Sequence, residues 1–277
     1  DGVQYATCST SANTDARRIL SLERPRDGDK MGPVAEFDDG GVQKYHGMLL
    51  GIQRRAGRGL TFNGNYTWSH CQGNYVDINQ NGPPADETYT KPNDRNFDRG
   101  NCISDRRHLL NFTTVAQTPQ FSNRTLRLLA SAWTVSGIYR WAAGAPLNVT
   151  QSTDIALSGT LLQRPNQVLG NPYKDTSGGP LTQWIDPAAF APQALGTYGN
   201  VGYNNVIGPK TWSFDMSLSR GFSFRETQRM EFRAEAFNVT NSYRPGNPNT
   251  TLSNNTFGQI RTALDPRIMQ FAVKYVF

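Results

Sequence analysis

The chain ends on the stretch that decides the fold, Asp265-Pro266-Arg267-Ile268-Met269-Gln270-Phe271-Ala272-Val273-Lys274-Tyr275-Val276-Phe277. In an extended strand, successive side chains point to opposite faces. One face is wholly apolar and ends in two aromatic residues: Met269, Phe271, Val273, Tyr275 and Phe277. The other face is mixed and includes Gln270 and Lys274. This division is typical of a transmembrane β-barrel strand, whereas an edge strand of a soluble β-sandwich usually has a polar outer face.

Composition favours strands and turns over helices. The 277 residues include 26 Gly and 16 Pro, and the apolar runs stay far below the ~18 residues that a membrane-spanning helix needs. A barrel remains possible because its lipid-facing residues alternate with polar ones. The net charge of +6 is dispersed, so we do not predict nucleic-acid binding. The chain starts at Asp1 without a leader, and we interpret it as a processed protein or a fragment.

Six further segments alternate like strands and precede the closing strand: 45–54, 60–69, 107–116, 126–141, 212–219 and 229–239. The connections between the seven strands alternate between short and long. In an up-and-down antiparallel meander, all short turns then lie at one end and all long loops at the other. Outer-membrane barrels show this asymmetry, with short periplasmic turns and long extracellular loops. We therefore predict an all-β transmembrane barrel portion at 44–277, preceded by a polar extracellular-side segment at 1–43.

The alternation also predicts which side chains face lipid. Phe62, Phe232 and Phe271 are expected to point into lipid, and Asn63, Arg233 and Gln270 into the lumen. Aromatic residues cluster at both strand ends, which predicts two membrane-interface girdles. One girdle, at the long-loop ends, would contain Tyr66, Trp68, Tyr139, Trp141 and Trp212, and the other Trp133, Tyr275 and Phe277 together with the apolar Leu60.

Several ordered motifs resemble one family. They are Asn65-Tyr66-Thr67-Trp68-Ser69-His70-Cys71, Asp98-Arg99-Gly100-Asn101-Cys102, Arg164-Pro165-Asn166, Asp186-Pro187-Ala188-Ala189-Phe190, Glu231-Phe232-Arg233-Ala234-Glu235-Ala236-Phe237-Asn238 and Phe257-Gly258-Gln259-Ile260. Over nearly its whole length the chain resembles the C-terminal part of TonB-dependent outer-membrane receptors, of the Oar-like branch common in Acidobacteria. The resemblance implies a bacterial outer-membrane location and active, non-enzymatic uptake of a bulky ligand such as an iron chelate, glycan or peptide.

The resemblance also implies partners and a larger barrel. Family members have about 22 strands and a plugged lumen, need no cofactor, and are energised by the TonB complex. A terminal Tyr275 and Phe277 would be an assembly signal for the barrel assembly machinery. This chain departs from the family in having seven strands and no recognisable plug or TonB-binding segment. We expect a missing N-terminal part, or another chain, to complete the barrel, because open strand edges cannot stand in lipid.

The alternative class is a secreted or surface β protein that binds or hydrolyses glycans. Glu231 and Glu235 could serve as acid and base, but Arg233 between them would hold both ionised, so a lumen-lining charge ladder is the preferred interpretation. Asn63 and Asn65 join these three residues as lumen-facing binding candidates. Trp184 and Phe190, in the longest loop, could stack on a sugar or aromatic ligand, with packing inside the loop as the simpler alternative.

The three cysteines predict one disulfide. Cys71 and Cys102 bracket one polar loop, so we expect them to pair in an oxidising compartment, with two reduced thiols as the alternative. Cys8 has no evident mate. Asp94, Asp98 and Asp105 could bind calcium, but arginines interleave them, and a salt-bridged loop is preferred. The histidines occur singly, and we predict no metal site.

Overall fold

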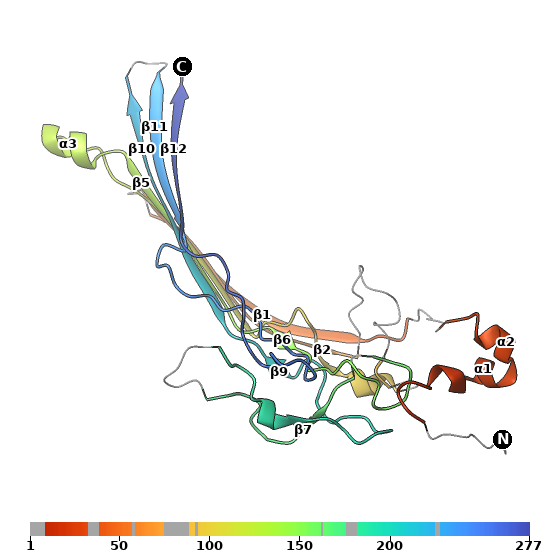
Figure 1. Ribbon diagram of the computed structural model, residues 1–277. Helices are drawn as coiled ribbons and strands as arrows, with labels where there is room; N and C mark the ends of the chain where they lie inside the picture. Colours follow the sequence, from red (N-terminus) through yellow and green to blue (C-terminus); the bar gives the residue numbers. More distant parts are fainter. Residues whose placement is uncertain are drawn as a thin grey trace.

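One antiparallel sheet forms the body of the molecule in the computed structural model, which describes residues 9–32, 39–56, 59–74, 89–91, 94–161, 163–175, 182–224 and 228–277 (Figure 1). Seven long strands follow one another in chain order across the sheet: β1 (Gln43–Ala56), β2 (Leu60–Gly73), β4 (His108–Gln117), β5 (Trp133–Ala142), β10 (Thr211–Ser223), β11 (Arg229–Phe237) and β12 (Ile268–Val276). The short β3 (Gly100–Asn101) pairs with the end of β2. This sequential meander confirms the predicted up-and-down sheet of long strands.

The strand register confirms that the alternating apolar residues share one face. Directly opposed residues lie on the same face, and Phe112 is opposite Gly64 on one side and Tyr139 on the other. The same counting places Phe62, Phe232 and Phe271 on this apolar face. Asn63, Arg233 and Gln270 lie on the opposite face, which is largely polar. We call these two faces the outward and the inward face.

Two glycines on the outward face are covered by aromatic rings. A Cβ at Gly64 would lie 3.1 Å from the ring of Phe112, and one at Gly137 would lie 3.2 Å from the ring of Phe214. A ring that lies over a strand glycine shields the backbone and fills the space that a side chain would take. A side chain at either position would require the covering ring to move by a few tenths of an ångström.

The connections sort by length as predicted. Residues 57–59, 118–132 and 224–228 link strands at one end, and 74–107, 143–210 and 238–267 link them at the other. The long connections gather at one end of the sheet, and the β10–β11 hairpin lies at the opposite end (Figure 1). We refer to these as the long-loop end and the short-turn end.

One predicted strand begins later than expected. Instead of extending through 126–141, the chain forms helix α3 (Arg124–Ala130), and strand β5 starts only at Trp133. The Asn123 side chain caps the helix by accepting hydrogen bonds from the backbone N–H groups of Thr125 and Leu126, at 2.9 and 3.2 Å. Ala132, at φ 61°, then turns the chain into the strand. The alternation of apolar and basic residues in 126–130 therefore predicts a strand where the chain forms a helix.

The first two strands extend further than predicted. β1 begins at Gln43, and β2 continues to Gly73, so His70 and Cys71 lie in a strand. Within 9–32, part of the predicted polar segment, the chain forms η1 (Asp15–Arg17), α1 (Ile19–Glu23) and α2 (Pro25–Gly28). The helices of the described residues are all too short or too polar to cross a membrane. A domain boundary at residue 43 stays a prediction.

The long connections fold into a cap with its own hydrophobic core. Its small elements are η3 (Arg95–Asp98), β6 (Pro146–Leu147), β7 (Asn166–Gln167), η4 (Pro187–Ala189), β8 (Phe190–Ala191) and β9 (Val206–Ile207). The buried cluster consists of Val149, Ile185, Ala189, Phe190, Val201, Val206 and Phe257. All but Phe257 belong to the β5–β10 connection, and Phe257 comes from the β11–β12 connection. Two loops that are distant in sequence therefore share one core.

Candidate functional site

The inward face of the sheet is a wall of paired polar side chains. Asn111 donates to the Asn65 side chain at 3.0 Å, and Arg140 lies 3.4 Å from the Asp215 carboxylate on the neighbouring strand. On β11, Arg233 forms ion pairs with Glu231 at 2.9 Å and with Glu235 at 3.7 Å. Charged side chains on one face of a membrane barrel belong to its water-filled or polar-lined interior. The inward face is thus the surface that a solute inside the barrel would meet.

A shallow groove of about 350 Å³ runs along this wall over β5, β10 and β11. Ser136, Asp215, Arg233 and Glu235 contribute polar groups of both charges to its lining. Such a surface can donate and accept hydrogen bonds and can complement a zwitterionic or polyhydroxylated solute. Arg233 bridges both neighbouring carboxylates, so the three residues form the charge ladder preferred from the sequence.

The structure does not bring all the predicted lumen residues together. Asn63 and Asn65 lie on β2, whereas Glu231, Arg233 and Glu235 lie on β11, with β4, β5 and β10 between them. They share the inward face but form two separate sets. Their role in binding stays a prediction.

Trp184 and Phe190 are packed within the cap. Phe190 is only 6% exposed, and its ring meets that of Phe257 edge to face at 5.6 Å. Trp184 packs against the buried cluster, and its indole N–H donates to the backbone carbonyl of Ile207 at 2.8 Å. Both residues thus contribute to packing within the loop, the simpler of the two interpretations of the sequence, and a role in stacking on a ligand stays a prediction.

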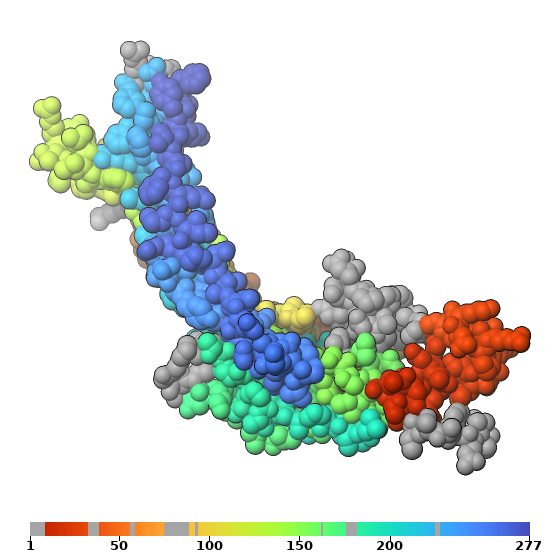
Figure 2. Space-filling model, viewed as in Figure 1, coloured from red at the N-terminus to blue at the C-terminus, as the bar shows by residue number. Residues whose placement is uncertain are grey.

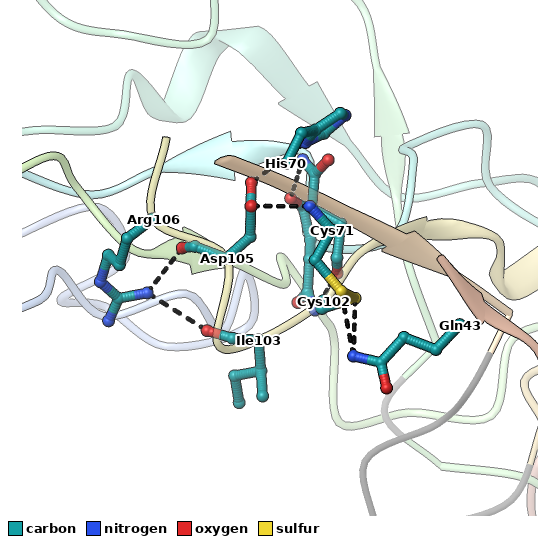
Figure 3. The surroundings of a disulfide bond; sticks show 9 residues. Gln43, His70, Cys71, Cys102, Ile103, Asp105 and Arg106 are labelled. Carbon is teal, nitrogen blue, oxygen red and sulfur yellow. Dashed lines mark hydrogen bonds and ion pairs between the residues drawn. A yellow bond between two sulfur atoms is a disulfide. The ribbon is translucent and has the colours of Figure 1, made fainter. Parts of the chain in front are cut away.

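The predicted disulfide between Cys71 and Cys102 is present, with the two Cα atoms 5.4 Å apart (Figure 3). The Gln43 side chain donates to both sulfur atoms, at 3.0 and 3.1 Å. Asp105 accepts a hydrogen bond from the Cys71 backbone N–H at 2.8 Å and lies 3.2 Å from the His70 ring. The disulfide and Asp105 together attach the β2–β4 connection to the end of β2. Cys8 lies outside the described residues.

The three loop aspartates have different partners from those expected. Asp94 pairs with Lys91 at 2.9 Å, and this hydrogen bond lowers the pKa of the Asp94 carboxyl from its ordinary value. Asp98 pairs with Arg164, and Asp105 with His70. Arg106, next to Asp105 in the sequence, donates to the backbone carbonyl of Asp105 at 2.8 Å. No group of His, Cys, Asp and Glu residues in the described parts of the chain has the arrangement of a metal site.

Arg164 connects two long loops, a role that the sequence did not reveal. Its side chain and that of Asp98 are each only 1% exposed, and the two form a buried ion pair. The guanidinium also donates to the backbone carbonyls of Val201 and Phe97, at 2.8 and 2.7 Å. Arg164-Pro165-Asn166 stands out as a motif, but its partner is 66 residues away in the chain. Sequence spacing contains no signal for such a pair.

At the long-loop end, aromatic residues of the neighbouring strands β5 and β10 contact each other. Trp212 is opposite Trp141 in the register, and its ring lies 6.2 Å from that of Tyr139. At the end of β12, the rings of Tyr275 and Phe277 stack with their centroids 6.0 Å apart. Recognition of these two residues by an assembly machinery stays a prediction.

An antiparallel meander with one apolar face, one polar face and long loops at one end defines the class of outer-membrane β-barrel proteins. The chain belongs to the family described as outer membrane beta barrel domain, whose model matches residues 3–270. No curated protein and no solved structure matches the chain. The family places the protein in the bacterial outer membrane, where the outward face contacts lipid.

Proposed function

We propose that this chain is the C-terminal barrel portion of a TonB-dependent transporter that takes up a bulky ligand, such as an iron chelate, a glycan or a peptide. The observation that supports it best is a polar wall on a sheet that does not close on itself. Within the described residues, β1 and β12 each have one neighbour and do not pair with each other. Strand edges cannot remain unpaired in lipid. The seven strands therefore fit a wider barrel, with further strands from the same or another chain.

A wider barrel has a lumen that can hold a plug and pass a large solute. The inward charges of Arg140, Asp215 and Arg233 suit such a water-accessible lumen better than the packed interior of a small barrel. Dependence on TonB rests on the ordered sequence motifs. The partners in this proposal are outer-membrane lipid, a plug, the TonB complex and the barrel assembly machinery.

Two measurements on the native full-length protein test the proposal. In planar lipid bilayers, a plugged transporter is expected to stay closed, whereas a passive porin conducts steadily. In cells, site-directed cross-linking is expected to join the protein to the periplasmic domain of TonB. A steady open pore together with no TonB cross-link would refute the transporter and indicate passive diffusion.

The inward wall supplies a matched pair of variants for uptake. Arg233 lies on the inward face and Arg54, opposite Phe62, on the outward face. We expect Arg233→Gln to lower energised uptake of the ligand, because it removes a guanidinium from the lumen wall, and Arg54→Gln to leave uptake unchanged. Equal uptake by both variants would show that the transported ligand does not depend on Arg233 of the inward face.

A further inference from the structure

A basic pocket of about 980 Å³ opens at the short-turn end, between α3 and the end of the β10–β11 hairpin. Five arginines and one glutamate contribute to its lining: Arg124, Arg127, Arg220, Arg229, Arg233 and Glu231. Glu231 is already paired with Arg233. Arg229, Glu231 and Arg233 project from the inward face of β11, whereas Arg124, Arg127 and Arg220 form the part of the pocket beside α3. Among the lining residues, this α3 side has positive charge and no carboxylate, so its occupant should be an anion.

Helix α3 presents two different faces at this pocket. Arg124, Arg127 and Leu128, at helical spacings of three and four, line the pocket. Leu126 and Leu129, three residues apart, lie outside the lining and are 49% and 64% exposed. Exposed leucines beside a basic face are the pattern of a helix that lies in a membrane interface. Figure 2 shows α3 standing out from the side of the strands at this end.

Arg220 fixes α3 to the outward face of the sheet. Arg220 is opposite Trp133 and Phe232 in the register, and its guanidinium lies 5.2 Å and 4.7 Å from the rings of Trp133 and Phe222. It donates to the backbone carbonyls of Arg127, Leu128 and Leu129. A cation at the C-terminal carbonyls complements the helix dipole. The Trp133 indole N–H also donates to the Leu129 carbonyl, at 2.8 Å. The end of the helix is therefore held against the lipid-facing side of the barrel.

We propose that this pocket binds the phosphate group of an anionic phospholipid in the periplasmic leaflet, while Leu126 and Leu129 enter the acyl-chain region. Three observations support a lipid rather than a soluble anion. The α3 side of the pocket, formed by Arg124, Arg127 and Arg220, adjoins the apolar outward face; apolar and basic groups lie side by side on α3; and short turns mark the periplasmic end of a barrel. The planar guanidinium group of arginine presents N–H donors that match two phosphate oxygens, and the resulting charge-assisted hydrogen bonds are short. This inference depends on the membrane location and not on transport.

Native mass spectrometry of the detergent-solubilised full-length protein tests the pocket directly. We expect the protein to retain phosphatidylglycerol about tenfold more strongly than phosphatidylcholine, because only the former has a net negative charge. Arg124→Gln/Arg127→Gln should abolish this preference. The matched control is Arg24→Gln/Arg26→Gln, in two exposed arginines near α2, at the far end of the molecule from α3 (Figure 1), and it should keep the preference. Heat-shifted mobility on gels confirms that each variant is folded.

The depth of α3 is measured separately, in vesicles of phosphatidylglycerol and phosphatidylcholine. In a Cys8→Ser background, a fluorophore on Leu129→Cys should be quenched by lipid-attached spin labels, and one on Leu264→Cys, in the β11–β12 connection, should not. Equal retention of the two lipids, or equal quenching at both positions, would overturn the proposal. Displacement of phosphatidylglycerol by millimolar inorganic phosphate would also overturn it and assign the pocket to a free anion. If Arg124→Gln/Arg127→Gln leaves lipid retention intact, a protein partner would be the occupant instead.

Discussion

Replacing Arg164 with Met should loosen the cap without unfolding the barrel. The guanidinium is buried and interacts with Asp98, two backbone carbonyls and the Thr90 hydroxyl, the last at 3.2 Å. Met fills a similar length but provides no charge and no donors. The change leaves the Asp98 carboxylate buried with only the Thr90 backbone N–H, at 2.6 Å, among these partners.

Removal of one member of a buried ion pair typically costs about 3–5 kcal/mol, mostly because the remaining charge has lost its partner. Because Arg164 and Asp98 lie on different loops, this free energy is lost from the association of the β2–β4 connection with the β5–β10 connection. Adding Asp98→Asn neutralises the uncompensated charge while keeping an acceptor for Thr90. We therefore expect the double variant Arg164→Met/Asp98→Asn to recover about 2 kcal/mol relative to Arg164→Met alone.

Hydrogen exchange of the folded protein, read by mass spectrometry, measures this local free energy. Exchange should accelerate at 97–101, 163–167 and 200–204 in Arg164→Met, slow again in the double variant, and stay unchanged along the strands. Arg99→Met, at an exposed arginine of the same loop, is the matched control and should change stability by less than about 0.5 kcal/mol. Unchanged exchange at 200–204 in Arg164→Met would show that the ion pair does not hold the loops together.

Three further predictions concern other parts of the molecule. Phe112→Arg, in the middle of β4 on the outward face, should lower barrel stability by about 2–4 kcal/mol, whereas Thr113→Arg on the inward face should cost little; urea unfolding in lipid vesicles compares them. Cys71→Ser/Cys102→Ser opens a loop with a sequence separation of 31 and should cost about 3–4 kcal/mol in denaturant unfolding, and a cost near zero would contradict this. Asn123→Ala removes the α3 cap and should cost the helix about 1 kcal/mol, seen as faster exchange at 125–130 with the strands unaffected.

The sheet could be predicted from the sequence because the alternation of apolar and polar residues within each strand shows which side chains share a face. A period of two residues is a local signal, and Phe62 and Asn63 reveal the two faces without knowledge of any neighbour. The order of short and long connections then fixes which strands are adjacent. The disulfide could also be predicted from the sequence, because Cys71 and Cys102 lie near the two ends of one loop.

The cap and α3 could not be predicted in this way. Phe190 meets Phe257, and Arg164 meets Asp98, across long sequence separations within segments that have no periodic pattern. In α3, the alternation of Leu126 and Leu128 with basic Arg127 fits a short strand as well as a helix, and the Asn123 cap decides between them. The candidate residues on the inward face were therefore placed on the correct side, but their division into two sets depends on the tertiary structure.

Phe257 makes the packing of one long loop depend on another. This side chain comes from the last long connection, yet it completes a core that otherwise belongs to the preceding one. The hydrophobic packing of the β5–β10 connection is therefore complete only when the β11–β12 connection is in place beside it. A change that loosens the shorter of these two loops would expose the core of the longer one, although the two are far apart in the sequence.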